Sequence, residues 1–571
     1  MRGRKKIFKK QVNERLSFIY PSQSVDELAD KILSFLKKYS GITKTGKKNK
    51  WNQKDAVLIT YADSIVGAKE TVPLNKLKEF ADEWLADKIS DIHILPFFPY
   101  SSDDGFSVID YYSVNPTHGD WEDIKNLRER FSLMFDLVIN HGSAQSKWFQ
   151  NFIKSTGEGS NYFLTAKHTD NLKEVVRPRS SPLLTRIDTA EGEKLVWTTF
   201  SDDQVDFDFK NPEVLLRFLD ILLYYMEKGA RIIRLDAIAF LWKEPGTSCL
   251  HLPQTHEIVK LMRDVMEYAN PSSVLLTETN VPNKQNLSYF GRGDEAHMVY
   301  QFSLPPLLLH ALYTGNTGYL VKWSSLLPPL PEGCTYFNFT ASHDGIGVRP
   351  LEGLLPDEEF NELIDGMKSH GGLISMRTLP DGAEVPYEIN ITYFDALKGT
   401  REGQDMMQVD RFLCAQLTML GMKGIPGIYI HSFFGTKNYL DGVEETGRNR
   451  TINRKSWNFD EITTLLKDKN SDTSLVFNRL TDALKVRADE EAFHPSAGQD
   501  IITAGKSLFV FSRGSGESRI LAIHNFSSQT YQLNTGRLGL SGKVVDILTM
   551  NKLKDKNLNL KPYQVSWLKE I

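Results

Sequence analysis

Eight short apolar runs recur along the chain from about residue 55, and most are separated by enough residues to form a helix. Runs of this kind are typical of strands that are buried on both faces of a parallel sheet. Eight of them favour a closed (β/α)8 TIM barrel over a doubly wound sheet, the other α/β arrangement. The predicted strands are Val57–Tyr61, Ile92–Phe97, Leu133–Ile139, Arg231–Leu235, Val274–Thr277, Met298–Phe302, Tyr336–Phe339 and Ile425–Ile430.

Other stretches depart from this alternation. The N-terminal residues show helical apolar spacing, and the C-terminal residues form short apolar runs divided by turn residues. About 90 residues separate the third barrel run from the fourth, and about 85 separate the seventh from the eighth, lengths that usually fold as subdomains or carry function. The predicted units are a helical extension (1–54), the barrel (55–490) with inserted subdomains B (about 142–205) and B′ (about 345–395), and a C-terminal β domain (491–571).

Composition and charge exclude several classes of protein. The 571 residues are 41% hydrophobic and 25% charged, which is usual for a globular chain of several domains or subdomains. A net charge of −4 gives no support to nucleic-acid binding. The distant Cys249, Cys334 and Cys414 exclude a disulfide scaffold. No apolar run approaches the roughly 18 residues of a membrane span, and no apolar segment of a secretory signal follows the basic N-terminus, so the cytoplasm is the predicted compartment.

Three acidic residues stand where predicted barrel strands end. Asp236, Glu278 and Asp344 follow the fourth, fifth and seventh runs, and the carboxyl ends of barrel strands share one rim. Each alone could be a structural ion pair or helix cap, but three converging carboxylates repel one another, which raises the pKa of one of them. A protonated carboxyl group beside an ionised one is suited to cleaving a glycosidic bond.

The strings around these acids resemble the conserved regions of the α-amylase superfamily, glycoside hydrolase family 13. The resemblance extends over nearly the whole chain from about residue 55 and is strongest to the sucrose phosphorylase group, which transfers glucose from an α-glucoside to phosphate with retention. The strings that carry it are Asp136–His141, Arg234–Ala237, Thr277–Thr279, His343–Gly347, Leu58–Asp63, Ile94–Phe98, Arg177–Arg179, Lys243–Cys249, Leu304–His310 and Ile452–Arg454.

The resemblance implies a role for each matching residue. Asp236 is expected to be the nucleophile that forms a β-glucosyl-enzyme, Glu278 the general acid and base, and Asp344 the carboxylate that holds the glucosyl hydroxyls. Arg234 is expected to orient Asp236, and His141 and His343 to contact the sugar. Asp103 and Arg450 are the expected pair at the far end of the sugar, and Phe106 is the expected stacking platform.

The acceptor side departs from sucrose phosphorylases. Glu388 follows Tyr387 where that group has glutamine, Asn280 stands where histidine is common, and Val176 replaces an aromatic residue. These departures, the string Thr277–Pro282 and the helical extension look like the glucosylglycerate phosphorylase branch.

Cationic residues are the candidates for binding anions on this side. Arg179 matches an arginine near the phosphate, and Arg179 and Lys243 are candidates for the glycerate carboxylate, although Glu388 disfavours an anion directly beside it. Phe200 is either an acceptor-site residue or subdomain core.

The expected activity is a retaining phosphorylase that transfers glucose from 2-O-α-glucosylglycerate to inorganic phosphate. The alternatives are a phosphorylase of sucrose, sucrose 6′-phosphate or glucosylglycerol, or a related α-glucosidase or transglucosidase. The complete set of three acids disfavours an inactive scaffold. Asn140 matches a calcium ligand of many amylases, but no convincing acidic set accompanies it, and the resembling group does not depend on calcium. We therefore expect no metal or cofactor, phosphate as co-substrate, small molecules as the partners, and neither nucleic acid nor membrane; the sequence leaves the oligomeric state open.

Overall fold

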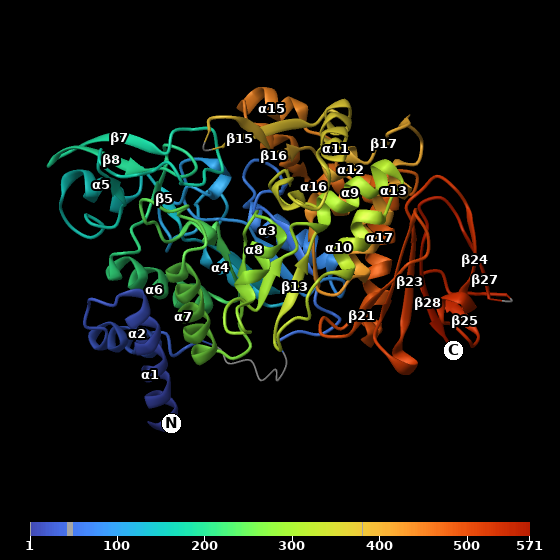
Figure 1. The fold of residues 1–571 in the computed structure, drawn as a ribbon, viewed down its shortest axis with the longest axis horizontal. Helices are drawn as coiled ribbons and strands as arrows, with labels where there is room; N and C mark the ends of the chain where they lie inside the picture. Colours follow the sequence, from blue (N-terminus) through green and yellow to red (C-terminus); the bar gives the residue numbers. More distant parts are fainter. Residues whose placement is uncertain (1, 43–49, 380, 555) are drawn as a thin grey trace.

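A closed barrel of eight parallel strands forms the centre of the computed structural model, which describes residues 2–42, 50–379, 381–554 and 556–571 (Figure 1). All eight predicted strands form, and the first pairs with the last, so the predicted barrel is confirmed. The strands are β1 (Val57–Thr60), β3 (Asp91–Ile94), β4 (Ser132–Val138), β10 (Ala230–Asp236), β11 (Val274–Thr277), β12 (Met298–Tyr300), β13 (Thr335–Asn338) and β19 (Ile425–Tyr429).

Helices connect the barrel strands, and their ends follow from local sequence. In α6, for example, the side chain of Asn211 accepts from the backbone N–H of Glu213, Pro212 begins the helix, and Gly229 ends it at φ 115°. The helices between barrel strands are α3 (Pro73–Phe80), α4 (Trp121–Arg128), α6 (Pro212–Lys228), α7 (Pro253–Ala269), α8 (Asn283–Leu287), α9 (Leu304–Thr314), α10 (Gly318–Ser325), α12 (Tyr393–Ala396) and α13 (Gln408–Gly421). Four more follow the last barrel strand: α14 (Ile430–Phe434), α15 (Leu440–Thr446), α16 (Phe459–Lys467) and α17 (Asp472–Asp489).

The connection between β4 and α6 is folded and is tied together at its base. β5 (His141–Ser143) pairs antiparallel with β9 (Gln204–Asp206), so the beginning and end of this insertion meet beside the barrel rim. This pairing brings His141 and Gln204 to the same place. The remainder comprises α5 (Lys147–Lys154) and a sheet of β6 (Thr165–Ala166), β8 (Gly192–Trp197) and β7 (Leu184–Thr189).

The connection between β13 and α13 forms a second small sheet above the rim. Its order is β14 (Ile346–Gly347), β16 (Glu384–Asn390) and β15 (Leu373–Thr378), and α11 (Asp357–Ser369) precedes the hairpin. Gly347 pairs with Glu388 in the antiparallel register. The sheet therefore holds Tyr387 and Glu388 close to the end of barrel strand β13.

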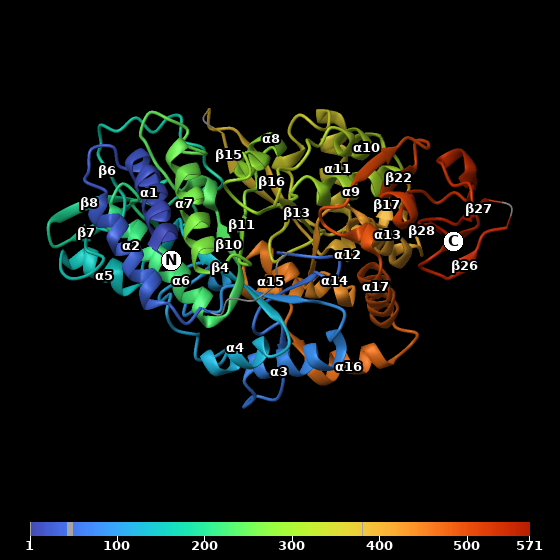
Figure 2. The same ribbon diagram turned by 90° about the horizontal axis from the view of Figure 1, so that it is seen from below.

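The C-terminal residues form an antiparallel sheet, as predicted. It lies at the opposite end of the molecule from the N-terminal helices (Figures 1 and 2) and is fastened to α13 by Arg513, whose Nη1 donates to the carbonyl of Gly421 at 2.8 Å. Its strands, in spatial order, are β21 (Gln499–Ile502), β22 (Leu508–Arg513), β23 (Ile520–Asn525), β28 (Val565–Glu570), β25 (Val544–Asp546) and β26 (Asn551–Lys552), beside a separate pair, β24 (Tyr531–Asn534) and β27 (Asn557–Leu560).

Two N-terminal helices, α1 (Arg2–Ile19) and α2 (Asp26–Lys38), lie against α7 and α6 (Figure 2). Arg15 bonds Glu257 at 2.8 Å and Asp264 at 3.1 Å on α7, and Lys38 bonds Asp220 on α6 at 2.8 Å. The extension thus braces the helices that lead into β10 and β11. Residues 43–49 of the predicted extension lie outside the described residues. Within the described part of the chain, no helix is long and apolar enough to cross a membrane.

Candidate active site

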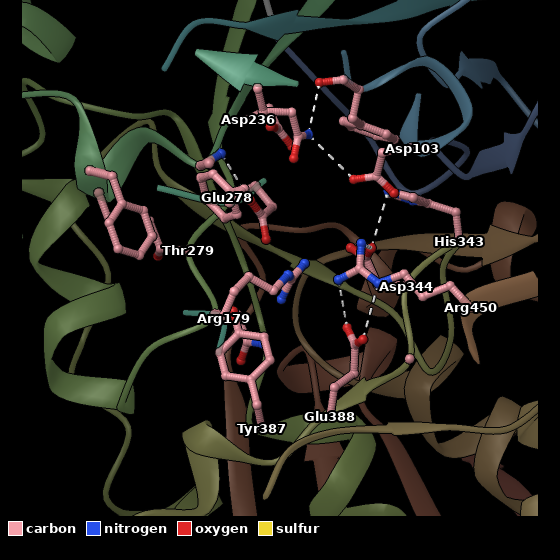
Figure 3. A pocket seen from close by; sticks show the side chains of 18 of the residues that line it. Asp103, Arg179, Asp236, Glu278, Thr279, His343, Asp344, Tyr387, Glu388 and Arg450 are labelled. Carbon is pink, nitrogen blue, oxygen red and sulfur yellow. Dashed lines mark hydrogen bonds and ion pairs between the residues drawn. The ribbon is translucent and has the colours of Figure 1, made fainter. Parts of the chain in front are cut away.

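A pocket opens at the carboxyl-terminal rim of the barrel, with an empty volume of about 690 Å³ including its mouth. Twelve of the fourteen predicted site residues line it, and Arg234 and Lys243 do not. The twelve are Asp103, Phe106, His141, Arg179, Phe200, Asp236, Glu278, His343, Asp344, Tyr387, Glu388 and Arg450, and Figure 3 labels all of them except Phe106, His141 and Phe200.

The buried guanidinium of Arg234 lies beneath the pocket. Its Nη1 donates to Asp236 Oδ1 at 2.8 Å and also to Asp136 Oδ1, and His93 Nε2 lies 2.6 Å from Asp136 Oδ2. Burial opposes the charge of Asp136, but Arg234 and His93 outweigh it and lower its pKa to about 2. Asp136 therefore fixes Arg234, and Arg234 fixes Asp236 at the end of β10. No hydrogen bond of the described residues involves Asp236 Oδ2, which leaves that oxygen available to a substrate.

Glu278 stands next to Asp236 and shares the same arginine. Its Oε2 accepts from the backbone N–H of Ala237 at 3.1 Å and lies 3.7 Å from Arg234 Nη2. Burial raises the pKa of both Asp236 and Glu278, and the neighbouring carboxylates raise both further. Such a pair holds a proton more readily than either acid alone. Arg234 lies closer to Asp236 than to Glu278 and therefore favours the negative charge on Asp236 more strongly.

Asp344 is kept ionised by arginine. Arg450 Nη1 lies 2.6 Å from Asp344 Oδ1, and its Nε and Nη2 bond Glu388 at 3.1 and 2.9 Å (Figure 3). Burial disfavours the charge on Asp344, but Arg450, His343 and Arg454 outweigh burial and lower the pKa of Asp344. Both oxygens of Glu388 are engaged by one guanidinium, so the charge of Glu388 is neutralised within the pocket wall.

Two neutral histidines and an aromatic ring form another wall. The ring of His343 stacks on Phe106 with centroids 4.6 Å apart and 3° between their planes, and His141 Nε2 lies 3.0 Å from the carbonyl of Phe106. Burial lowers the pKa of both histidines. One face of the Phe106 ring is therefore covered by His343, and Phe106 still lines the pocket.

Asp103 and Arg450, the two residues expected at the far end of the sugar, bond different partners. Both line the pocket, but Arg450 is engaged by Asp344 and Glu388, and no ion pair joins it to Asp103. Arg454 is the arginine beside Asp103, at 3.8 Å, and it also pairs with Asp104 at 2.5 Å. Two neighbouring acids compete for Arg450, and their shorter contacts explain the difference.

Arg179 is a cation without a carboxylate partner among the described residues. Its Cζ lies 5.4 Å from the ring centroid of Tyr387 and 5.7 Å from that of Phe200, and its one hydrogen bond is a long contact of 3.4 Å to the carbonyl of Pro178. In Figure 3 it lies beside Tyr387, across from Glu278. Aromatic faces hold a guanidinium in place while leaving its N–H groups free for an anion.

The predicted role of Lys243 in binding glycerate is wrong. Its ammonium is buried behind the pocket, bonded to Asn140 Oδ1 and to the carbonyl of Phe240 at 2.8 Å each and to Asp206 Oδ2 at 2.9 Å. Three oxygen acceptors use the three donors of an ammonium, so none remains for a ligand. Lys243 joins the base of the first insertion to the turn after β10.

A metal site requires free ligands, and the oxygen cluster around Lys243 already contains a cation. In the part of the chain that the structure describes, no group of three or more His, Cys, Asp and Glu residues is arranged to hold a metal ion.

Sequence reasoning assigned no role to several residues of the site. His93 and Asp136 are polar residues inside buried barrel strands, an anomaly visible in the sequence, and they hold Arg234 in place. Gln204 lines the pocket and donates to the carbonyl of Phe106 at 3.1 Å. Arg454 donates to the carbonyl of His343 at 2.9 Å. Arg454 ends the string Ile452–Arg454 that carries the family resemblance, so its place in that motif was a signal that sequence reasoning did not use.

Comparison with known proteins agrees with this geometry. A barrel of eight parallel strands with three acids at its rim defines an α-amylase-type catalytic domain, and residues 88–322 match the family model described as "Alpha amylase, catalytic domain". The crystal structure of a sucrose 6F-phosphate phosphorylase from Thermoanaerobacter thermosaccharolyticum is similar with a TM-score of 0.72 and 26% identity, over 83% of this chain and 94% of that one.

Two curated relatives narrow the family further. The chain is 41% identical to the glucosylglycerate phosphorylase of Escherichia coli, over 98% of this chain and 100% of the relative. It is 47% identical to that of Spirochaeta thermophila, over 83% of this chain and 80% of the relative. The chain belongs to the glucosylglycerate phosphorylase family within glycoside hydrolase family 13.

Replacing Lys243 tests its structural assignment. Lys243→Met leaves Asp206 as a buried charge without its cation, so we expect a lower unfolding temperature, with a loss of about 3 kcal/mol or more. The KM for glycerate in the reverse reaction should stay close to that of the unmodified enzyme, as judged by thermal unfolding and initial rates. A raised KM for glycerate in a protein of unchanged stability would restore the contact that the sequence predicted. Lys210→Met, which removes an exposed pair with Glu244, is the matched control.

Proposed function

We propose that the protein is a retaining phosphorylase that transfers glucose from 2-O-α-glucosylglycerate to inorganic phosphate, producing α-glucose 1-phosphate and glycerate. The observation that carries the proposal is the combination, in one pocket, of the adjacent acids Asp236 and Glu278 with Arg179, a cation that has no carboxylate partner among the described residues. A hydrolase needs no such cation beside its acids, whereas a phosphorylase must bind an anion there. Both curated relatives described above are named as glucosylglycerate phosphorylases.

In the first step, Oδ2 of Asp236 attacks the anomeric carbon of the glucosyl unit. The bond from this carbon to the glycerate oxygen breaks, and the proton of Glu278 passes to that oxygen. Arg234 holds Asp236 in position through Oδ1, and the ionised Asp344 stabilises the positive charge that develops on the sugar. The products of this step are a β-glucosyl-enzyme, free glycerate and an ionised Glu278.

In the second step, a phosphate oxygen attacks the anomeric carbon from the side that glycerate left. Its proton passes to Glu278, the bond to Asp236 breaks, and the carboxylate is restored. Two inversions at one carbon give net retention. Glycerate and phosphate therefore occupy the same side of the sugar in turn, and both are anions.

A single arginine can serve both anions because they bind in succession. Lys243 is fully engaged, so Arg179 is the cation we assign to the glycerate carboxylate and to phosphate alike. The objection that Glu388 would repel an anion is removed by its pairing with Arg450 through both oxygens.

We further propose that the reaction needs no metal or cofactor, since the chain's own residues supply each proton and charge in the two steps. Phosphate is the co-substrate. The cytoplasm is the proposed compartment, and the three buried free thiols of Cys249, Cys334 and Cys414 support a reducing environment.

The direct test measures the release of α-glucose 1-phosphate in the presence of phosphate, with glucosylglycerate and sucrose as parallel donors. We expect phosphate-dependent release from glucosylglycerate and little from sucrose. Preferred release from sucrose would move the enzyme to the sucrose phosphorylases, and free glucose formed without phosphate dependence would make it a hydrolase.

The protonation of Glu278 predicts how its replacement behaves. Glu278→Gln should lose about three orders of magnitude or more in kcat on glucosylglycerate, because the leaving oxygen is no longer protonated. The formation of the glucosyl-enzyme from α-glucosyl fluoride, whose leaving group needs no acid, should be largely retained.

The pH dependence gives an independent check. Glu278 donates only while it is protonated, so its raised pKa places the loss of activity on the alkaline side of the kcat/KM profile. For Glu278→Gln we measure the rate of the pre-steady-state burst with α-glucosyl fluoride across the same pH range. That rate should show no loss on the alkaline side, because this leaving group needs no acid. Asp236→Asn should show no burst with either donor, and a burst in that variant would contradict the assignment of the nucleophile.

Arg179→Ala should weaken the binding of both anions, glycerate and phosphate, but not the binding of the glucosyl unit. With glucosylglycerate we expect the KM of donor and of phosphate each to rise by about tenfold or more, whereas with α-glucosyl fluoride only the phosphate KM should rise. Initial-rate kinetics with the two donors provide the measurement. Arg177→Ala, whose side chain bonds the carbonyl of Ser180 and does not line the pocket, is the control. An equal rise in the KM of both donors would mean that Arg179 holds the sugar.

A further inference from the structure

The turn Ser101–Ser107 carries two pocket residues, Asp103 and Phe106, in a backbone conformation that side chains disfavour. Asp103 and Asp104 have φ values of 50° and 48°, and Gly105 follows at 111°. A Cβ atom at Gly105 would lie 2.4 Å from the carbonyl oxygen of Pro96. Successive left-handed residues persist only where surrounding contacts impose them, so the turn requires an external restraint.

One carboxylate oxygen accepts hydrogen bonds from both ends of this turn. Asp203 Oδ2 accepts from the hydroxyls of Ser101 and Ser102 at 2.5 Å each and from that of Ser107 at 2.7 Å. The hydroxyl of Ser107 also lies 3.1 Å from the backbone carbonyl of Asp203. The carboxylate thus joins Ser101 and Ser102, before the left-handed segment, to Ser107, which lies two residues after it.

The position of Asp203 in the fold makes it a fixed anchor. It precedes β9, which is paired with β5 at the base of the insertion, and its carbonyl accepts from the backbone N–H of Ala144 at 2.9 Å. The next residue, Gln204, donates to the carbonyl of Phe106, inside the turn. None of the ion pairs among the described residues includes Asp203, so the serine hydroxyls are the groups that stabilise its charge.

Asp203 does not line the inner pocket that contains the catalytic acids. It lines an outer cleft beside that pocket, together with Asp103 and Arg179, and its hydrogen bonds reach the inner pocket through the turn. A restraint of this kind matters most for the residues it carries, Asp103 and Phe106, which lie on the sugar side of the pocket, and least for Arg179 on the anion side.

We propose that Asp203 is a positioning residue for the sugar side of the site: its carboxylate gathers three serine hydroxyls and holds the turn Ser101–Ser107 in the conformation that places Asp103 and Phe106 against the glucosyl unit. The inference rests on the proposed function only in taking a glucosyl group as the occupant of the pocket.

The test compares Asp203→Ala with Asp203→Asn, and uses Asp202→Ala as the matched control. Asp202 is exposed, and its replacement removes the same charge one residue away. Asn keeps an oxygen that accepts from hydroxyls, whereas Ala keeps none. We measure initial rates in both directions, thermal unfolding, and the binding of glucose by calorimetry.

For Asp203→Ala we expect the KM for glucosylglycerate and for α-glucose 1-phosphate to rise by about tenfold, and the phosphate KM, measured at saturating donor, to stay within about twofold. Asp203→Asn should recover most of the loss, and Asp202→Ala should behave as the unmodified enzyme. If Asp203→Ala does not fold, Ser107→Ala removes one hydroxyl and should show the same split to a smaller extent.

The proposal is overturned if the donor constants of Asp203→Ala are unchanged, if all constants change equally, or if Asn rescues nothing. The calorimetric measurement separates this proposal from the proposed function. If the unmodified protein binds glucose but lacks phosphorylase activity, the proposed function is disproved and the positioning role is not. In that case weaker glucose binding by Asp203→Ala supports the positioning role, and unchanged binding overturns it.

Discussion

The structure of the site depends on one buried guanidinium. Arg234 is an internal residue of strand β10, and its charge is tolerated inside a barrel because Asp136 on the adjacent strand and Asp236 at the end of its own strand accept its hydrogen bonds. A buried charge is stable only when its hydrogen bonds are satisfied by partners of opposite sign. His93 on the next strand bonds the far oxygen of Asp136 and completes the chain of contacts. The same arrangement leaves one oxygen of Asp236 free and places Arg234 closer to Asp236 than to Glu278.

Arginine plays a comparable part on the other side of the pocket, where Arg450 connects Asp344 with Glu388. The second insertion brings Glu388 over the rim, and its carboxylate draws the guanidinium toward the small sheet above β13. Within the pocket, negative charge is thus paired around the sugar side, whereas the cation of Arg179 is left without a carboxylate on the anion side. This separation of charge is the feature on which the proposed exchange of glycerate and phosphate depends.

Both insertions matter because they complete the walls that the barrel strands begin. The first supplies His141, Arg179 and Gln204 to the pocket, and Lys243 fastens its base through Asp206. Lys243 shows why a cationic residue near a site in sequence need not be a ligand contact. Its ammonium gains three oxygen partners by pointing into the interior, and the free energy of satisfying it there is larger than that of one exposed contact to a small acid.

The sequence by itself determined the eight strands, the C-terminal sheet and the three acids at the strand ends, because apolar periodicity and the position of a polar residue after a buried run are local properties. It also led correctly to the family, since the motif strings carry the catalytic residues with them.

Only the tertiary structure decided which arginine pairs with which acid, that Lys243 is internal, and that the ring of His343 covers one face of Phe106. These outcomes depend on distances between segments far apart in the chain, such as Asp103 and Arg454 or Lys243 and Asp206, and on competition among several partners for each charge. No local pattern records the result of that competition, because it is settled only when the folded chain fixes which groups are desolvated together.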